Sequence, residues 1–93
     1  MQTEVLKVLQ RFFGYTGESK FLHWEEIEKI VAGKNYYLEV RKLHNIPNCL
    51  VLENHDWSRV IVDVQGDTRQ DVVEKAIIGL GKELDKRDTT VST

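Results

Sequence analysis

The stretch that decides the fold runs from Cys49 to Arg87 and begins with two runs of alternating character, Cys49-Leu-Val-Leu-Glu53 and Arg59-Val-Ile-Val-Asp-Val64. Apolar residues recur at every second position in both runs, as in a β-strand with one apolar face. The segment between them, Asn54-His-Asp-Trp-Ser58, is short and rich in turn-forming residues. The stretch therefore predicts an antiparallel hairpin.

The alternation also assigns a face to each side chain of these strands. In the second run it predicts that Val60, Val62 and Val64 point into the core. Leu50 and Leu52 alternate in the same way in the first run. We therefore expect a sheet with one strongly apolar face, covered by helices, and one mixed face.

A helix is expected to follow the hairpin and to begin at Thr68. Thr68 and Asp71 have the spacing of a capping box, and an aspartate there also suits the positive end of the helix dipole.

Gly79 and Gly81 interrupt the helix, and each costs about 1 kcal/mol relative to alanine. We interpret both as positions of close packing. The apolar stripe contains Val73, Ile77, Leu80 and Leu84, and the polar face contains Glu74, Lys75, Lys82 and Asp85.

Length and charge limit the class of protein. The 93 residues suffice for one hydrophobic core. An apolar fraction of 41% with 30% charged residues is ordinary for a globular domain. Thirteen basic and fifteen acidic residues give a net charge of -2. This is neither the broadly basic balance of an obligate nucleic-acid binder nor the strong acidity of a nucleic-acid mimic.

The same features predict one domain in a reducing compartment. We expect a single compact domain over residues 1–87 and a disordered C-terminal tail over residues 88–93. The single cysteine, Cys49, excludes an internal disulfide. No apolar run is long enough to span a membrane, and the N-terminal residues lack the apolar core of a secretory signal. These observations predict a cytoplasmic protein without a membrane partner.

Two helices are predicted before the hairpin. The first covers Thr3 to Phe13, with a wide apolar stripe and Gly14 as its stop. The second covers His23 to Ala32, where Trp24 has the spacing of a core residue and glutamates occupy the first turn. Gly33 closes this second helix.

The segment 35–45 fits two structures. Residues from Tyr36 to Val40 alternate in polarity, which favours a strand, although Tyr36, Val40 and Leu43 also have helical spacing. The strand, which we prefer, gives an α+β fold: two N-terminal helices, a three-stranded antiparallel meander whose first turn is Ile46-Pro47-Asn48, and a C-terminal helix packed on the sheet. The helix gives a winged helix-turn-helix domain, with residues 35–45 as the recognition helix.

In the strand interpretation, the chain from His23 onward has the order α-β-β-β-α. This order resembles that of the double-stranded-RNA-binding domain and of the Alu-binding subunits of the signal recognition particle. The resemblance is one of element order and implies an RNA-binding-like domain. The turn from Val64 to Gln70 departs from the first family, because it lacks a lysine-rich helix start.

Residues suited to catalysis or metal binding are few. The soft metal ligands are His44, Cys49 and His55, and their spacing matches no zinc pattern. Cys49 beside Leu50 is more typical of a small core residue. A short chain without a nucleophile motif or a phosphate-binding loop offers little from which to build an active site. We expect no enzymatic activity, no metal and no cofactor.

The preferred functional hypothesis is a small non-enzymatic binding or regulatory module, an inhibitor or adaptor, that engages a protein partner. Trp57 lies at the predicted hairpin tip near Arg59, and aromatic residues and arginine are enriched at binding hot spots. Tyr37 and Ile61 extend this surface if they lie on the mixed face of the sheet. The alternative is that Trp57 folds back over the sheet edge. An exposed strand edge offers another contact, through strand addition or a homodimer.

The second functional hypothesis is nucleic-acid binding by a winged-helix-like or RNA-binding-like domain. Four residues that can carry positive charge concentrate in one segment: Lys34, Arg41, Lys42 and His44. A few such charges suffice for phosphate contacts, which make binding fall steeply with salt. Glu39 interrupts the group, and a solvated strand or helix face explains the charges equally well.

Overall fold

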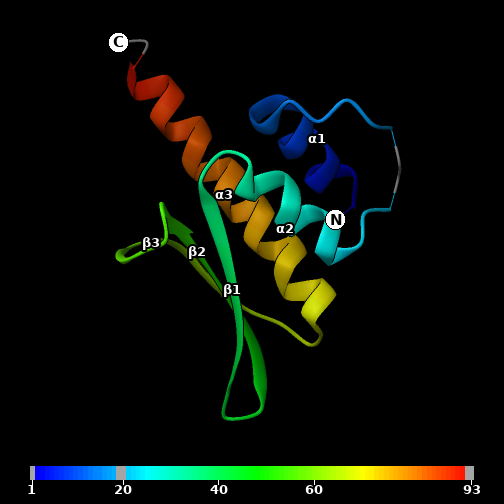
Figure 1. Cartoon of the computed structure of the whole chain (residues 1–93), viewed down its shortest axis with the longest axis vertical. Coiled ribbons are helices and arrows are strands. Elements are labelled where there is room, and N and C mark those ends of the chain that lie inside the picture. The colour runs from blue at the N-terminus through cyan, green and yellow to red at the C-terminus, as the bar shows by residue number, and fades with distance from the viewer. Residues whose placement is uncertain (1, 19–20, 92–93) are drawn as a thin grey trace.

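The elements follow the order α-α-β-β-β-α in a computed structural model that describes residues 2–18 and 21–91. They are α1 (Gln2–Phe13), α2 (Trp24–Ala32), β1 (Tyr36–Leu43), β2 (Ile46–Glu53), β3 (Asp56–Gln65) and α3 (Arg69–Val91) (Figure 1). The strands form one antiparallel sheet with the order β1-β2-β3. The α+β prediction is confirmed. The winged helix-turn-helix alternative is wrong, because β1 occupies the segment that it required to be helical.

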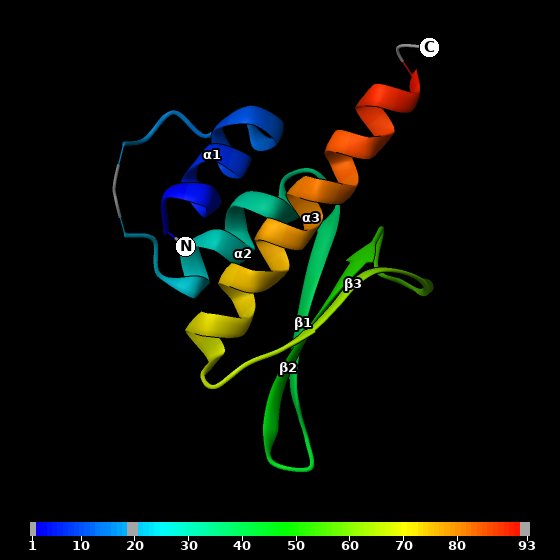
Figure 2. The ribbon, with the colours of Figure 1, turned by 180° about the vertical axis from the view of Figure 1, so that it is seen from behind.

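The helices lie on one face of the sheet. α3 packs across β2 and β3, α2 packs on β1, and α1 packs on α2 and α3 (Figures 1 and 2). The residues at their centre are buried and belong to one apolar cluster. No helix within residues 2–18 and 21–91 is long and apolar enough to cross a membrane.

Both hairpin turns are two residues long. His44 and Asn45 have φ values of 53° and 65°, and Asn54 and His55 have φ values of 57° and 58°. Such backbones are typical of tight hairpin turns, in which asparagine tolerates the left-handed conformation. The predicted turn at Ile46-Pro47-Asn48 is therefore wrong, because the chain has already reversed at His44 and these residues belong to β2.

The start of α3 agrees with the predicted cap. The Asp71 N–H donates to Thr68 Oγ1 at 3.0 Å, which identifies Thr68 as the N-cap residue. The Asp71 carboxylate in turn accepts a hydrogen bond from the Asp67 N–H at 3.1 Å.

The end of α3 differs from the prediction. The helix continues through Val91, beyond Arg87, where the sequence placed the end of the domain, and residues 92–93 lie outside the described chain. Extending a formed helix adds a hydrogen bond for each residue that is fixed, and this favours continuation beyond the packed turns.

A β-bulge changes which residues of β3 face the core. Val51 is opposite Val62 and both are buried in the apolar cluster, whereas Leu52 is opposite Val60. Because neighbours on β2 point to opposite faces, the additional residue Ile61 places Val60 on the face without helices. The prediction that Val60 points into the core is therefore wrong. Leu50 and Leu52 also lie on that face, although neighbouring side chains bury them.

Gly79 and Gly81 are positions of close packing, as predicted. A Cβ atom at position 79 would lie 3.1 Å from Val62 Cγ1, and one at position 81 would lie 2.5 Å from Val8 Cγ2. Glycine therefore lets α1 approach α3 at position 81 and lets β3 approach it at position 79.

The substitution Gly81→Ala is expected to destabilise the protein by about 1 kcal/mol, because overpacking costs about 1–3 kcal/mol and the gain in helix propensity returns about 1 kcal/mol. Urea unfolding measures this change in the free energy of unfolding. In a Val8→Ala background the same substitution should cost less, because its steric partner is gone. An equal cost in both backgrounds would contradict the close contact.

Polar side chains join α1, the loop before α2 and the first turns of α3. Gln70 Nε2 donates to the Leu22 carbonyl oxygen and to Glu74 Oε2, both at 2.8 Å, and Gln70 Oε1 accepts the Trp24 N–H at 2.9 Å. The Gln2 side-chain amide also donates to Glu74 Oε2. Glu74 is only 6% exposed, so its assignment to the solvent face of α3 is wrong.

Candidate functional site

The face of the sheet that carries no helix is the first candidate surface. Its centre is apolar, because Leu50 and Leu52 of the middle strand are buried there. Around them, the strand register places polar and apolar side chains: Tyr37, Glu39 and Arg41 on β1, Asn48 on β2, and Val60 and Asp63 on β3. This open face is mixed in character, as the sequence predicted for one side of the sheet.

Exposed apolar side chains gather at the end of the sheet beside the β2–β3 turn. Tyr37 and Val60 flank Leu52 in the register and are 38% and 43% exposed. The ring of His55 lies 4.6 Å from that of Tyr37, measured between centroids. Trp57 follows the turn and is 57% exposed, so its side chain is not buried against the sheet edge. We call Tyr37, His55, Trp57 and Val60 the aromatic patch.

Two other residues predicted for this surface have different positions. Arg59 is exposed, and its Nε atom lies 3.6 Å from Asp56 Oδ2. The hydroxyl and the N–H of Ser58 donate to Asp56 Oδ1 and hold the pKa of that carboxyl below its usual value. Ile61 is half-buried at the bulge and packs against the apolar core, so it does not extend the patch.

The residues proposed for phosphate contact are spread along β1. Lys34 precedes the strand and His44 follows it, so an eight-residue strand separates them, a length of about 25 Å. Arg41 and Lys42 are neighbours on a strand and therefore point to opposite faces. Arg41 Nε donates to Asn48 Oδ1 at 3.2 Å on the open face. The structure does not bring these four residues into one cluster.

The candidate metal ligands and the thiol are also separate. His44 and His55 occupy the turns at opposite ends of β2, and Cys49 is buried within that strand. Burial raises the pKa of the Cys49 thiol to about 12, and the nearby Glu28 carboxylate adds to this effect. Within the described part of the chain, no group of three or more His, Cys, Asp or Glu residues could hold a metal ion.

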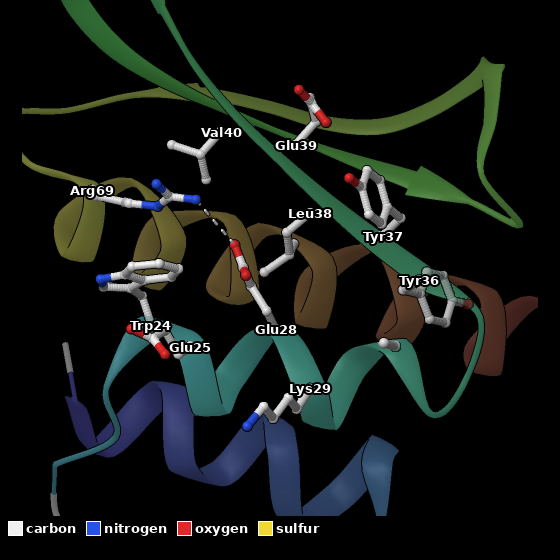
Figure 3. A pocket seen from close by; sticks show the side chains of 11 residues that line it. Trp24, Glu25, Glu28, Lys29, Tyr36, Tyr37, Leu38, Glu39, Val40 and Arg69 are labelled. Atoms are coloured by element: carbon white, nitrogen blue, oxygen red, sulfur yellow. Dashed lines mark ion pairs between the residues drawn. The ribbon is translucent and has the colours of Figure 1, made fainter.

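A cavity of about 570 Å³ lies between α2 and β1 (Figure 3). Arg69 reaches into it from α3, and its guanidinium carbon lies 3.9 Å from the centroid of the Trp24 ring. Arg69 Nη2 is 3.9 Å from Glu28 Oε1, the ion pair drawn as a dashed line. Trp24 is thus half-buried, packing on the core while it lines this cavity.

Acidic side chains outnumber basic ones around the cavity. Glu25, Glu28 and Glu39 line it together with Lys29 and Arg69. Partial burial raises the pKa of Glu28, Arg69 opposes this shift, and the carboxylates of Glu25 and Glu39 add to it. The residues that line the cavity therefore include one more acidic than basic side chain.

Sequence reasoning missed the cavity and two members of the aromatic patch. The sequence indicates His55 only as a candidate metal ligand and predicts Val60 as a core residue. The two-residue turn at Asn54–His55 is the signal that could have placed His55 beside the sheet. No protein-family model, curated protein or solved structure matches this chain. Function is therefore argued from the geometry of the open face and of the cavity.

Proposed function

We propose that this protein is a small non-enzymatic binding module that engages a protein partner through the open face of its sheet, with the aromatic patch as the main contact. The observation that carries the proposal is the exposure of Tyr37 and Val60 at one end of that face, and of Trp57 just after the β2–β3 turn at the same end of the sheet. Burying such side chains against a partner removes apolar surface from water. Tryptophan and tyrosine do so with few rotatable bonds to immobilise.

The surroundings of the patch support a specific contact. His55 packs on Tyr37, and the buried Leu52 lies beneath, so the patch has a fixed base. Asn48 links the strands of the open face, because its Nδ2 donates to Asp63 Oδ1 at 2.7 Å and to the Val64 carbonyl oxygen at 2.8 Å. A preformed surface of this kind loses little conformational entropy on binding.

Protein binding takes precedence over the two other functions for physical reasons. The basic residues are spread along β1, and carboxylates lie around the cavity beside it, so no extended positive surface faces a phosphate backbone. Cys49 is the thiol that could have served as a nucleophile, but its raised pKa keeps it protonated at neutral pH. Nucleic-acid binding remains the second hypothesis.

The test is the substitution Trp57→Ala. Immobilised wild-type and variant proteins are compared for the proteins that they retain from an extract of the source cells, measured by quantitative mass spectrometry. We expect a partner whose retention falls at least about tenfold with the variant, because loss of a tryptophan hot spot costs about 2 kcal/mol or more. Thermal unfolding should be nearly unchanged, since the side chain is mostly exposed.

Phe21→Ala is the matched control. Phe21 lies in the loop before α2, not in the sheet, and is 59% exposed, close to the value for Trp57. This variant should retain the same partner as the wild type. Equal retention by the wild type and by Trp57→Ala would reject the aromatic patch as the binding surface.

A further inference from the structure

β1 is an edge strand with a free row of backbone groups. Within the described chain its only partner strand is β2. Leu43 and Ile46 are opposite each other across the two-residue turn, so this pair exchanges both of its backbone hydrogen bonds. Hydrogen-bonded pairs alternate along an antiparallel ladder. The N–H and C=O groups that point away from β2 therefore belong to Leu38, Val40 and Lys42.

The side chains of β1 are complementary to those of a second β1 strand. With Val40 of each copy opposite Val40 of the other in an antiparallel pair, Glu39 faces the partner's Arg41 and Tyr37 faces the partner's Leu43. These pairs lie on the open face, where Tyr37 and Leu43 are both exposed. Opposite charges and apolar groups in directly opposed positions stabilise a strand pair. The register also aligns the free backbone groups, since Leu38 faces the partner's Lys42.

The helices leave room for this pairing. The cavity beside α2 is lined by β1 residues from Tyr36 to Val40, whereas the turn end of the β1–β2 hairpin projects past the helices (Figures 1 and 2). When the two-fold axis passes through the Val40 pair, the N-terminal half of β1, which lies beside α2, is opposite the C-terminal half of the partner's β1. Within the described residues, that C-terminal half has no helix beside it. Each α2 therefore lies beside the partner's bare hairpin.

The acidic cavity has a matching cation in this arrangement. Leu38 lines the cavity and would lie opposite the partner's Lys42, on the face of the sheet that α2 covers. Lys42 is exposed in the single chain. In the pair its ammonium group would approach Glu25 and Glu28, which line the same cavity.

We propose that two copies of this chain form a symmetric dimer by antiparallel pairing of their β1 strands, with Val40 at the two-fold axis. The product is a continuous six-stranded sheet in which each copy contributes Lys42 to the cavity of the other. The proposal goes beyond partner binding through the aromatic patch. Both contacts include Tyr37, but the variants at positions 39, 41 and 42 leave the patch unchanged and Trp57→Ala leaves β1 unchanged, so the two proposals fail separately.

The test is a charge exchange at positions 39 and 41, measured by sedimentation velocity over a wide range of protein concentration. Glu39→Arg places like charges opposite each other twice, and Arg41→Glu does the same with the opposite sign. Each variant should raise the dimer dissociation constant at least about tenfold. The double variant Glu39→Arg/Arg41→Glu restores opposite charges and should dimerise like the wild type.

A mixture of the two single variants provides the sharpest result. Arginines of the first variant then face glutamates of the second at both positions, so the mixture should form a heterodimer although each variant alone is monomeric. Lys42→Pro is a variant of another kind, because it removes an N–H at the free edge, where proline is tolerated in a strand. It should remain folded by circular dichroism and lose the dimer.

Several outcomes would overturn the proposal. A wild-type protein that stays monomeric at all concentrations would show that the β1 edge does not form a dimer. The edge would then be open to pairing with another strand, such as one from a partner protein. A dimer that survives the single charge variants and Lys42→Pro would use another surface. Failure of the two single variants to associate with each other would exclude the Val40 register.

Discussion

In the folded protein, Cys49 is expected to react with a thiol reagent about a thousandfold more slowly than in the unfolded protein. Burial raises the pKa of this thiol from 9.0 to about 12, so the reactive thiolate becomes about a thousandfold rarer at neutral pH. The side chain is also inaccessible between the strands and the helices. The rate of colour release from an aromatic disulfide reagent, with and without denaturant, measures the ratio. Comparable rates would contradict a buried thiol.

The same pKa shift makes stability depend on alkaline pH. Below pH 9.0 the thiol is protonated in both states, and the full stabilisation is present. Between pH 9.0 and about 12 the thiol ionises in the unfolded chain but not in the folded one. The free energy of unfolding therefore decreases as the pH rises, on the order of 1 kcal/mol per pH unit.

Urea unfolding of the wild type and of Cys49→Val, at about pH 8 and about pH 10, isolates this effect, since only the thiol differs in titration. All other groups are common to both proteins, so their contributions cancel in the comparison. We expect the wild type to lose more stability than the variant between the two pH values. Parallel losses would show that the thiol ionises equally in both states.

Replacing Gln70 with alanine should cost about 2–4 kcal/mol in the free energy of unfolding. This side chain satisfies the Leu22 carbonyl, the Trp24 N–H and part of the Glu74 carboxylate, and all three lose a partner at once. A partly buried polar group without a partner costs about 1–3 kcal/mol. Chemical denaturation followed by tryptophan fluorescence measures the loss.

Lys75→Ala is the control on the same helix. Its ammonium group lies 3.2 Å from Asp71 Oδ2 in a solvent-accessible ion pair, which is worth well under about 1 kcal/mol. A loss from Gln70→Ala that is no larger than the loss from Lys75→Ala would mean that water replaces the amide without cost. The network would then not hold the loop before α2 to the start of α3.

The sequence predicted those features that depend on short-range chemistry. The cap at Thr68 and the alternation in β1 involve neighbouring residues only, and both are present in the structure. The first turn was predicted around Pro47 because proline is common in turns, whereas the backbone reverses at His44 and Asn45. Proline is tolerated in β2 because Pro47 is the second residue of the strand.

Features that depend on packing between elements could not be predicted. The inward or outward position of Val60 depends on the bulge at Ile61, and the pattern of alternation gives no sign of it. Glu74 occupies a polar position on an isolated helix, but in the fold it is buried and accepts hydrogen bonds from Gln2 of α1 and from Gln70. The cavity likewise depends on a contact between separate helices, because Arg69 of α3 packs on Trp24 and pairs with Glu28, which both belong to α2.

The position of α3 has a consequence for synthesis on the ribosome. Among the described elements this helix is synthesised after the other five, yet it contacts each of them, including α1. Until its buried turns leave the exit tunnel, α1, α2 and the sheet lack the one helix that contacts all of them. The apolar stripe of α1 therefore lacks its α3 partner while the residues between the two helices are made, and the fold closes through contacts between segments that are far apart in the sequence.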